Sequence, residues 1–245
     1  MKAAQPDTST PAVEVRDLVK RFGNFYALRG ISLQVPTGEC LAIFGPNGAG
    51  KTTFLRILSA ISRPSSGEVS IHGLALQERS LAVRRRLGVI GHQTFLYDDL
   101  SAVENLMFYA RLYDLGAPRE RARAALAEVD LEKRADDRVR SFSRGMQQRL
   151  AIARALLHEP SILFLDEPYT GLDQHAAVML TGWLQKLRNQ RRTILVVTHD
   201  LAQGLAMADR LMIFVGGRVV WQERAAHVEA RRLHEIYFDL VSGGR

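Results

Sequence analysis

Apolar residues along this chain follow two different spacings. Short apolar or alternating runs predict β-strands, and apolar residues at helical spacing predict amphipathic helices. The predicted strands cover residues 13–19, 31–35, 39–44, 68–71, 87–91, 162–165, 193–197, 211–215 and 218–221. The predicted helices cover residues 53–58, two stretches within 101–157, residues 175–188, a short segment from 201 and residues 225–241.

The order of these elements predicts an α/β fold. Strands that alternate with helices favour a mostly parallel sheet covered on both faces. Residues from about 97 to 157 carry helical spacing, with Pro118 suited to a first helical turn, so we expect an inserted α-helical subdomain. Gly216 and Gly217 predict a tight hairpin. We expect a disordered tail over 1–11, one large domain over 12–222 and an amphipathic C-terminal helix within 223–245.

A glycine-rich segment lies between a predicted strand and a predicted helix, and it matches G-x-x-x-x-G-K-[ST] in full. Such a turn points several backbone N–H groups at one spot, which the helix dipole makes attractive to a di- or triphosphate. Lys51 is expected to reach the β- and γ-phosphates, and Thr52 to hold Mg²⁺. The expected nucleotide-binding residues here are Gly45, Pro46, Asn47, Gly48, Ala49, Gly50, Lys51, Thr52 and Thr53.

Two carboxylates, Asp166 and Glu167, follow the buried run 162–165. Ligands gather outside the carboxyl ends of parallel strands. Asp166 is therefore expected to hold Mg²⁺ through water, and Glu167 to orient or deprotonate an attacking water. A helix N-cap is the alternative reading of an Asp-Glu pair after a strand, but the neighbouring phosphate loop favours the catalytic one.

The composition is that of a soluble globular protein, with 47% hydrophobic and 24% charged residues. No apolar run approaches the roughly 20 residues of a membrane-spanning helix. The polar residues 1–11 lack the apolar segment of a signal peptide. Cys40, the single cysteine, fits a reducing cytosol.

The formal charge of +7 includes arginine clusters at 84–86, 191–192 and 231–232. Such clusters could serve nucleic acid, an anionic membrane leaflet or bound nucleotide, and solvated helix faces are the simpler explanation. No aromatic residues interleave with the clusters in a stacking pattern, so we expect no nucleic-acid partner.

Further motifs follow in a fixed order, and together they resemble the ATP-binding subunits of ABC transporters over residues 13–221. The resemblance implies a P-loop NTPase fold with an N-terminal antiparallel β subdomain, and ATP hydrolysis with Mg²⁺. It implies an adenine-stacking role for Phe22 and a Mg²⁺-contacting Q-loop role for Gln93. It also implies a D-loop at Thr170–Asp173 that includes Asp173, and a switch role for His199, which joins Glu167 and Lys51 as catalytic residues.

The signature segment of that family corresponds to Ser143, Arg144, Gly145 and Met146. Arg144 stands where the commonest pattern has glycine, and a backbone with positive φ there would be less comfortable for arginine. Ser143 and Gly145, which reach a γ-phosphate in the family, are present. We therefore expect ATPase activity to be kept, with an inactive site as the alternative.

The resemblance also implies partners. In the family, the signature of one copy covers ATP on the phosphate loop of a second copy, in a head-to-tail sandwich. A second copy of this chain and integral membrane subunits are thus expected, with the chain peripheral on the cytoplasmic face of the inner membrane. Aromatic residues in 94–100 either cap the local core or grip a helix of a membrane subunit.

Within the family, residues 90–97, 100–113 and 140–150 resemble the heme-exporter ATPases of cytochrome c maturation. Exporters of drugs, polysaccharide or lipid share parts of this pattern and stay as alternatives, followed by a soluble non-transport ABC ATPase. A phosphate-loop kinase or GTPase would lack the signature and the switch histidine together. The spacing of His92, His158 and His199 does not indicate a heme site.

Overall fold

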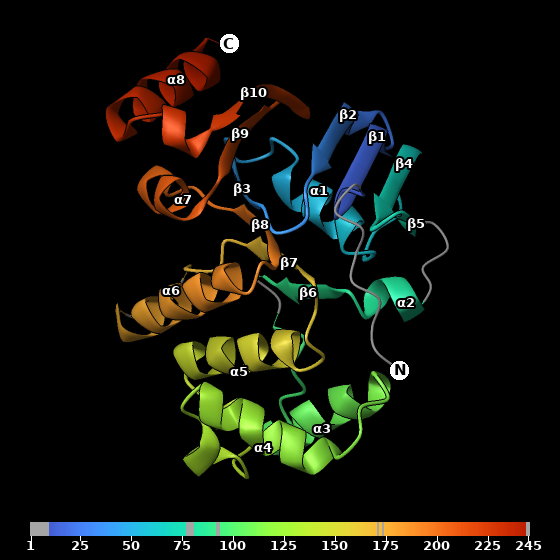
Figure 1. The fold of residues 1–245 in the computed structure, drawn as a ribbon, viewed down its shortest axis with the longest axis vertical. Coiled ribbons are helices and arrows are strands. Elements are labelled where there is room, and N and C mark those ends of the chain that lie inside the picture. The colour runs from blue at the N-terminus through green and yellow to red at the C-terminus, as the bar shows by residue number, and fades with distance from the viewer. Residues whose placement is uncertain (1–9, 77–80, 92–93, 171, 173, 244–245) are drawn as a thin grey trace.

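Two β-sheets and an attached group of helices make up the fold (Figure 1). The structure is a computed structural model that describes residues 10–76, 81–91, 94–170, 172 and 174–243. The larger sheet has six strands in the order β10-β9-β3-β8-β7-β6, all parallel except β10, which pairs antiparallel to β9. Its strands are β3 (Cys40–Phe44), β6 (Leu87–Ile90), β7 (Ile162–Asp166), β8 (Thr193–Val197), β9 (Arg210–Val215) and β10 (Arg218–Arg224). The prediction of a mostly parallel core sheet is confirmed.

The smaller sheet is antiparallel, with the order β2-β1-β4-β5, as the N-terminal β subdomain was expected to be. It contains β1 (Val13–Phe22), β2 (Phe25–Val35), β4 (Ser66–Ile71) and β5 (Leu74–Ala75). The first two strands extend beyond their predicted ends. The pairing of β1 with β2 shifts register between Val15 and Leu18, and Asp17 has a φ of 45°. A bulge of this kind breaks the alternation on which the prediction relied.

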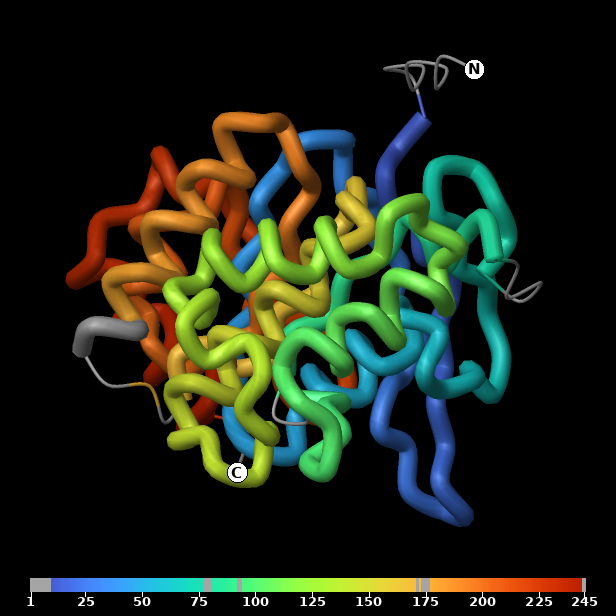
Figure 2. The backbone as a smooth tube through the Cα atoms, turned by 90° about the horizontal axis from the view of Figure 1, so that it is seen from below, coloured from blue at the N-terminus to red at the C-terminus, as the bar shows by residue number. Residues whose placement is uncertain are grey.

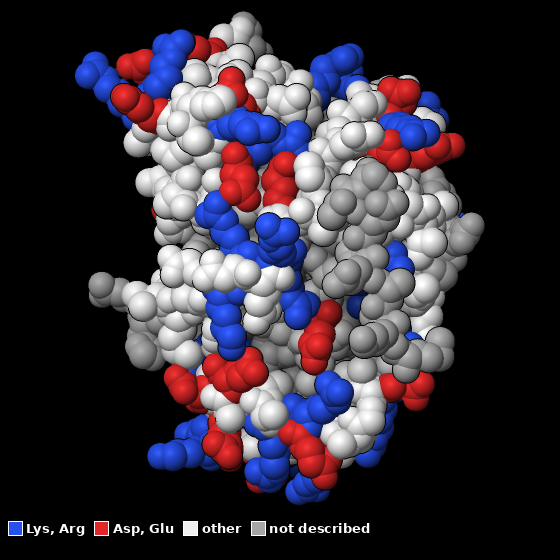
Figure 3. All heavy atoms as spheres, viewed as in Figure 1, with Lys and Arg blue, Asp and Glu red and all other residues white. Residues whose placement is uncertain are grey.

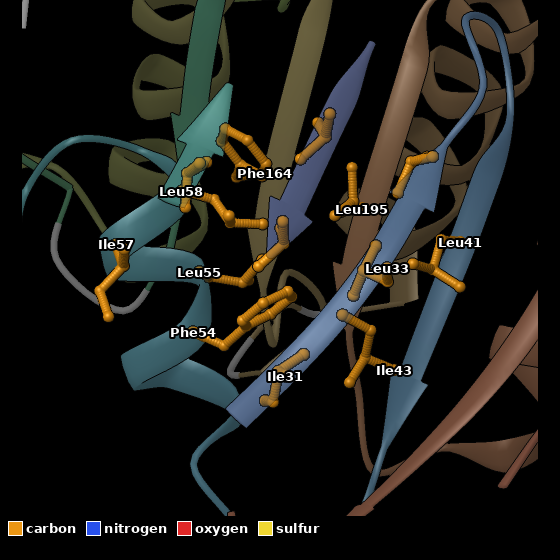
Figure 4. Close-up of a cluster of buried hydrophobic side chains, with 14 of the residues drawn as sticks. Ile31, Leu33, Leu41, Ile43, Phe54, Leu55, Ile57, Leu58, Phe164 and Leu195 are labelled. Carbon is orange, nitrogen blue, oxygen red and sulfur yellow. The ribbon is translucent and has the colours of Figure 1, made fainter. Parts of the chain in front are cut away.

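Helix α1 (Lys51–Leu58) lies between the two sheets and joins them through one hydrophobic core. In Figure 4, Phe54 of this helix points toward the strand that carries Ile31 and Leu33, and Leu58 lies beside Phe164. The helix begins at Lys51, two residues before the predicted start.

The other face of the large sheet is covered by three helices, at the left of Figure 1. They are α6 (Gln174–Asn189), α7 (Leu201–Met207) and α8 (Ala230–Ser242). Leu233 of α8 is fully buried against this face. The predicted start of α8 at residue 225 is wrong, because Ala225–His227 form a separate 3₁₀ turn and the α-helix begins after Glu229.

The inserted helical subdomain is present and contains α3 (Ala102–Leu112), α4 (Pro118–Glu128) and α5 (Arg144–Leu156). Figure 2 shows α3 and α4 in front of the sheets. Ser101 caps α3 in a capping box with Glu104, and Pro118 opens α4 as predicted. The subdomain has a hydrophobic cluster of its own, which includes Leu106, Leu126 and Leu150.

Two short elements were not predicted, namely β5 and α2 (Leu81–Arg84). The expected tail falls mostly on residues 1–9, outside the described residues. Among the described residues, no helix combines the length and apolarity that crossing a bilayer requires.

Candidate functional site

The phosphate loop follows β3 and is fixed by glycines that leave no room for a side chain. Gly45 has a φ of 144°, and a Cβ there would lie 2.2 Å from the Phe214 carbonyl oxygen. Gly50 has a φ of 99°, and its Cβ would lie 2.4 Å from the Ala27 carbonyl oxygen. A Cβ on Gly48, by contrast, would meet no atom of the described residues within 4 Å. The loop is thus clamped against β2 and β9 on one side and open on the other.

Lys51 lies inside this loop with 8% of its surface exposed. Its Nζ donates to the carbonyl oxygens of Gly45 at 2.6 Å and Pro46 at 3.0 Å. Burial lowers the pKa of Lys51, and the Glu167 and Asp166 carboxylates act against this effect. Within the described part of the chain, Lys51 has no salt bridge. A buried ammonium held by carbonyls beside an open cradle of N–H groups suits a polyphosphate.

Thr52 and Asp166 bring two oxygens together at the start of α1 and the end of β7. Thr52 Oγ1 donates to Asp166 Oδ1 at 3.2 Å. A hydroxyl and a carboxylate are hard oxygen donors of the kind that Mg²⁺ prefers. These residues therefore fit a Mg²⁺ ion bound together with the phosphates.

Glu167 has a strained backbone, with a φ of 52° in the left-handed region. Its N–H donates to the Val197 carbonyl at 2.9 Å, which ties it to β8. His199 follows β8, and its Nδ1 lies 2.7 Å from Glu167 Oε2. The alternative reading of Glu167 as a helix cap is wrong, because α6 begins only at Gln174. The carboxylate is oriented by His199 and can accept a proton from a water.

A cavity of about 560 Å³ is lined by residues that include Lys51, Thr52, Asp166 and Glu167. Phe22, for which the resemblance implies adenine stacking, is among the residues that line the cavity and has 55% of its surface exposed. Phe25, Ile61 and Phe95 also line the cavity and were not predicted. Phe25 begins β2, Ile61 follows α1 and Phe95 follows β6. These segments come together only in the folded chain, so residue spacing does not reveal that they line one cavity.

A larger depression of about 1490 Å³ lies at the amino ends of β3 and β9, opposite the phosphate loop. Its walls carry ion pairs of Arg188 with Asp209 and of Arg210 with Glu39. On the face shown in Figure 3, basic and acidic side chains are similarly mixed over α8 and around α3 and α4. The described residues that line this depression include no counterpart of the phosphate loop and its metal ligands, so we place the functional site at the phosphate loop.

The signature residues lie away from this cavity. Ser143 caps α5, and its Oγ accepts from the Met146 N–H at 3.3 Å. Arg144 is the first residue of the helix and does not have a positive φ, so the strain considered for an arginine at this position does not arise. Ser143 and Arg144 are exposed, and neither they nor Gly145 and Met146 are among the described residues that line the cavity of the same chain.

Two predicted residues, Gln93 and Asp173, lie outside the described residues. The described residues Gly91 and Thr170 lie shortly before them in the sequence. Gly91 follows β6, and a Cβ on it would lie 3.5 Å from Asp166 Cβ. Thr170 donates its N–H to the Glu167 carbonyl at 3.1 Å.

Comparison with known proteins gives a consistent result. The family model described as "ABC transporter" matches residues 28–170. The daunorubicin resistance ATP-binding protein DrrA3 of Streptomyces coeruleorubidus is 38% identical over 221 residues, which cover 89% of this chain and 70% of the relative. The ABC transporter ATP-binding protein NatA of Bacillus subtilis is 38% identical over 224 residues, covering 88% of this chain and 89% of the relative.

The Nod factor export ATP-binding protein I of Burkholderia orbicola is 37% identical over 221 residues, covering 89% of this chain and 72% of the relative. Among solved structures, an ATP-binding subunit of an ABC transporter superposes with a TM-score of 0.85 at 30% identity, covering 94% and 99% of the two chains. The dimeric post-hydrolysis state of the cassette MJ0796, bound to ADP and Pi, gives a TM-score of 0.80 at 31% identity, covering 87% and 98%.

The Thr52–Asp166 pair generates a prediction about Mg²⁺. We expect Thr52→Val to weaken ATP binding about 10-fold in the presence of Mg²⁺, because one oxygen ligand is lost. In EDTA the variant and the original chain should bind ATP alike. Isothermal titration under both conditions measures this, with Thr37→Val, at an exposed residue that is not among the described residues lining the cavity, as the matched control. A Thr52→Val variant with the original Mg²⁺ dependence would contradict the assignment.

Proposed function

Because this chain belongs to the ABC transporter family, we propose that it is the ATP-hydrolysing subunit of an exporter, working as a pair of identical chains. The observation that carries the proposal is that five residues lie together at the carboxyl ends of β3, β7 and β8. They are Lys51, Thr52, Asp166, Glu167 and His199. These are the parts that phosphoryl transfer to water needs: a phosphate cradle, metal ligands and an oriented base.

In the proposed reaction, ATP lies with its phosphates over the loop and its adenine against Phe22. Lys51 neutralises charge on the β- and γ-phosphates, and Mg²⁺ held by Thr52 and Asp166 would supply further neutralisation. Glu167 orients the attacking water and accepts its proton, while His199 holds the carboxylate in place. Gln93 is proposed to contact the metal, as the resemblance implies.

Pairing of two copies is proposed because the phosphate loop and the signature segment are apart within one chain. A single loop leaves the outer side of the γ-phosphate in water, and Ser143 and Gly145 at the N-terminus of α5 are not among the described residues around the cavity of the same chain. A second copy can bring that helix N-terminus over the phosphate, which adds donors and excludes water. The dimeric structure of MJ0796 supports this arrangement. Asp173 is proposed to lie near the junction of the two copies.

A membrane subunit is proposed to bind the aromatic surface formed by Phe95, Tyr97, Phe108 and Leu112. Their exposed fractions are 40%, 48%, 40% and 59%. The rings of Tyr97 and Phe108 meet edge to face at 5.0 Å. Phe95 also packs on Arg154, so this segment both caps the local core and offers a surface. An exposed apolar group of this kind suits a helix of a partner, and it would hold the chain at the cytoplasmic face of the inner membrane.

We propose heme as the cargo, in cytochrome c maturation. The support is the resemblance of residues 90–97, 100–113 and 140–150 to the heme-exporter ATPases. The first two of these segments include the aromatic surface, where the identity of a membrane partner would be read. The named relatives, a drug-resistance ATPase and a Nod factor export ATPase, support the alternative of another exporter, whose cargo is a drug, a polysaccharide or a lipid.

Substitution of the general base should separate ATP-driven pairing from turnover. We expect Glu167→Gln to bind ATP and form a stable pair, while hydrolysis falls at least about 100-fold because the base is lost. Light scattering with saturating ATP should give twice the monomer mass. Lys51→Ala, which removes the phosphate contact, is the control that should remain monomeric. A monomeric Glu167→Gln chain at saturating ATP would count against the proposal.

The aromatic surface can be tested with the pair Tyr97→Asp and Phe108→Asp. Two charges in an apolar interface should abolish co-purification with the membrane subunits, because burying unpaired carboxylates is costly. ATP affinity should stay unchanged. Phe238→Asp, at an exposed aromatic residue on α8, is the matched control. A loss of ATP affinity in the double variant would show that these residues support the core instead.

The cargo prediction uses the complex purified from its own membranes and reconstituted in vesicles. Heme should stimulate ATP hydrolysis by the complex and should be transported, whereas daunorubicin should do neither. The complex carrying Glu167→Gln is the control for heme effects unrelated to turnover. Stimulation by daunorubicin without stimulation by heme would overturn the heme proposal and leave the exporter proposal standing.

A further inference from the structure

Arg154 of α5 is a buried cation, with only 9% of its surface exposed. Burial lowers its pKa, and an arginine nevertheless remains protonated in a protein. In the described part of the chain it forms no salt bridge, and its Nε is buried with no hydrogen-bond partner. A buried charge left in this state is expensive, so its position needs an explanation other than ion pairing.

Aromatic rings surround the guanidinium instead. Its Cζ lies 5.4 Å from the ring centre of Phe95 and 5.3 Å from that of Tyr109. The Tyr109 hydroxyl donates to the Phe95 carbonyl, which fixes the two rings relative to each other. Cation–π contacts are stronger for a desolvated guanidinium than for an exposed one. The contacts of Arg154 therefore join α5 to α3 and to the segment that leads out of β6.

The same side chain also covers the edge of the large sheet. Among the described strands, β6 is at the edge, with β7 on one side only. Two carbonyl groups are capped by side chains from the end of α5: the Val89 oxygen accepts from Arg154 at 2.6 Å, and the Leu87 oxygen lies 2.9 Å from His158 Nε2. Covering an edge in this way prevents pairing with other chains. His158 thus provides a comparison, since it does the same task from the other end of the strand.

The two caps differ in their distance from the nucleotide site. Val89 is two residues before Gly91, and Gly91 lies against Asp166. Leu87 is at the other end of the strand. At its other terminus α5 carries Ser143 and Gly145. A helix is stiff along its axis, so a contact near one end can set the position of the other.

We propose that Arg154 is a positioning residue that makes the signature end of α5 follow the carboxyl end of β6. The inference rests on the proposed function, because a movement of the signature end of α5 matters only if ATP drives the pairing of two copies. In this proposal, the carboxyl end of β6 changes its position when nucleotide and metal bind beside Asp166. Arg154 passes this change of position on to α5, because its side chain contacts Val89, Phe95 and Tyr109 at once.

The test compares Arg154→Met with His158→Gln. Methionine keeps much of the volume and removes the buried charge, so folding should survive even though the Val89 carbonyl loses its donor. We expect Arg154→Met to keep its affinity for ATP as a monomer and a KM within about twofold, while kcat and ATP-driven pairing fall about 10-fold. His158→Gln should lower the melting temperature without this split.

A distance measurement gives a readout that a purely stabilising role would not change. Spin labels on cysteines introduced at the exposed residues Glu120 of α4 and Glu68 of β4 report the position of the helical subdomain relative to the core. Cys40 is buried and should stay unlabelled. In a Glu167→Gln background, ATP should shift this distance, and adding Arg154→Met should abolish the shift.

The outcomes separate the two proposals. If the original chain neither pairs nor hydrolyses ATP, the proposed function fails. If it does both, and Arg154→Met shows the same kcat and the same ATP-driven shift, the role of Arg154 is refuted alone. Should Arg154→Met not fold, Arg154→Lys takes its place. Lysine keeps the charge among the rings but lacks the planar fork that reaches Val89, so the same loss of the shift is expected.

Discussion

The parallel register of three strands is the constraint on which the site depends. Ile43 of β3 and Asp166 of β7 both lie opposite Val197 of β8. The phosphate loop, the two carboxylates and His199 all follow these positions within two residues. Because parallel strands end at one edge, residues far apart in sequence meet there without any long connecting loop. The N–H of Glu167 extends this ladder by one bond to the Val197 carbonyl, which also holds the strained backbone in place.

The fold contains two buried cations, Lys51 and Arg154, whose surroundings differ. Lys51 is held by carbonyl oxygens next to an open cavity, so its charge remains available to an anion that enters. Arg154 is enclosed by rings and has no such access among the described residues. The chemistry of the residue type fits each case: a compact ammonium suits a phosphate oxygen, and a flat guanidinium stacks on aromatic faces. Burial alone therefore does not identify a binding residue, and access to space is the deciding feature.

Most of the fold and the centre of the site follow from local patterns. The phosphate loop and the Asp166–Glu167 pair could be predicted from residue spacing, because each lies directly beside the strand that positions it. His199 also follows a strand, but its role was expected only from the family resemblance, because a lone histidine after a strand does not by itself indicate a function. The bulge at Asp17 and the 3₁₀ turn at Ala225–His227 could not be predicted, since each depends on pairing or packing with distant residues. The backbone at Arg144 could not be inferred from the signature pattern either, because it is set by the cap that Ser143 provides. The lining by Phe25 and Phe95 arises only when separate segments fold over one loop.

The helical subdomain has a hydrophobic cluster of its own, apart from the one that seats α1. Substitutions on the outward side of α3 therefore leave the packing around the phosphate loop untouched. Selection for a different membrane companion can act on one set of positions while the hydrolytic machinery stays constant. The two surfaces meet at Phe95, which belongs to the aromatic surface and also lines the nucleotide cavity. A change of partner can therefore proceed through the outward side of α3 with little effect on hydrolysis, whereas a change at Phe95 would affect both.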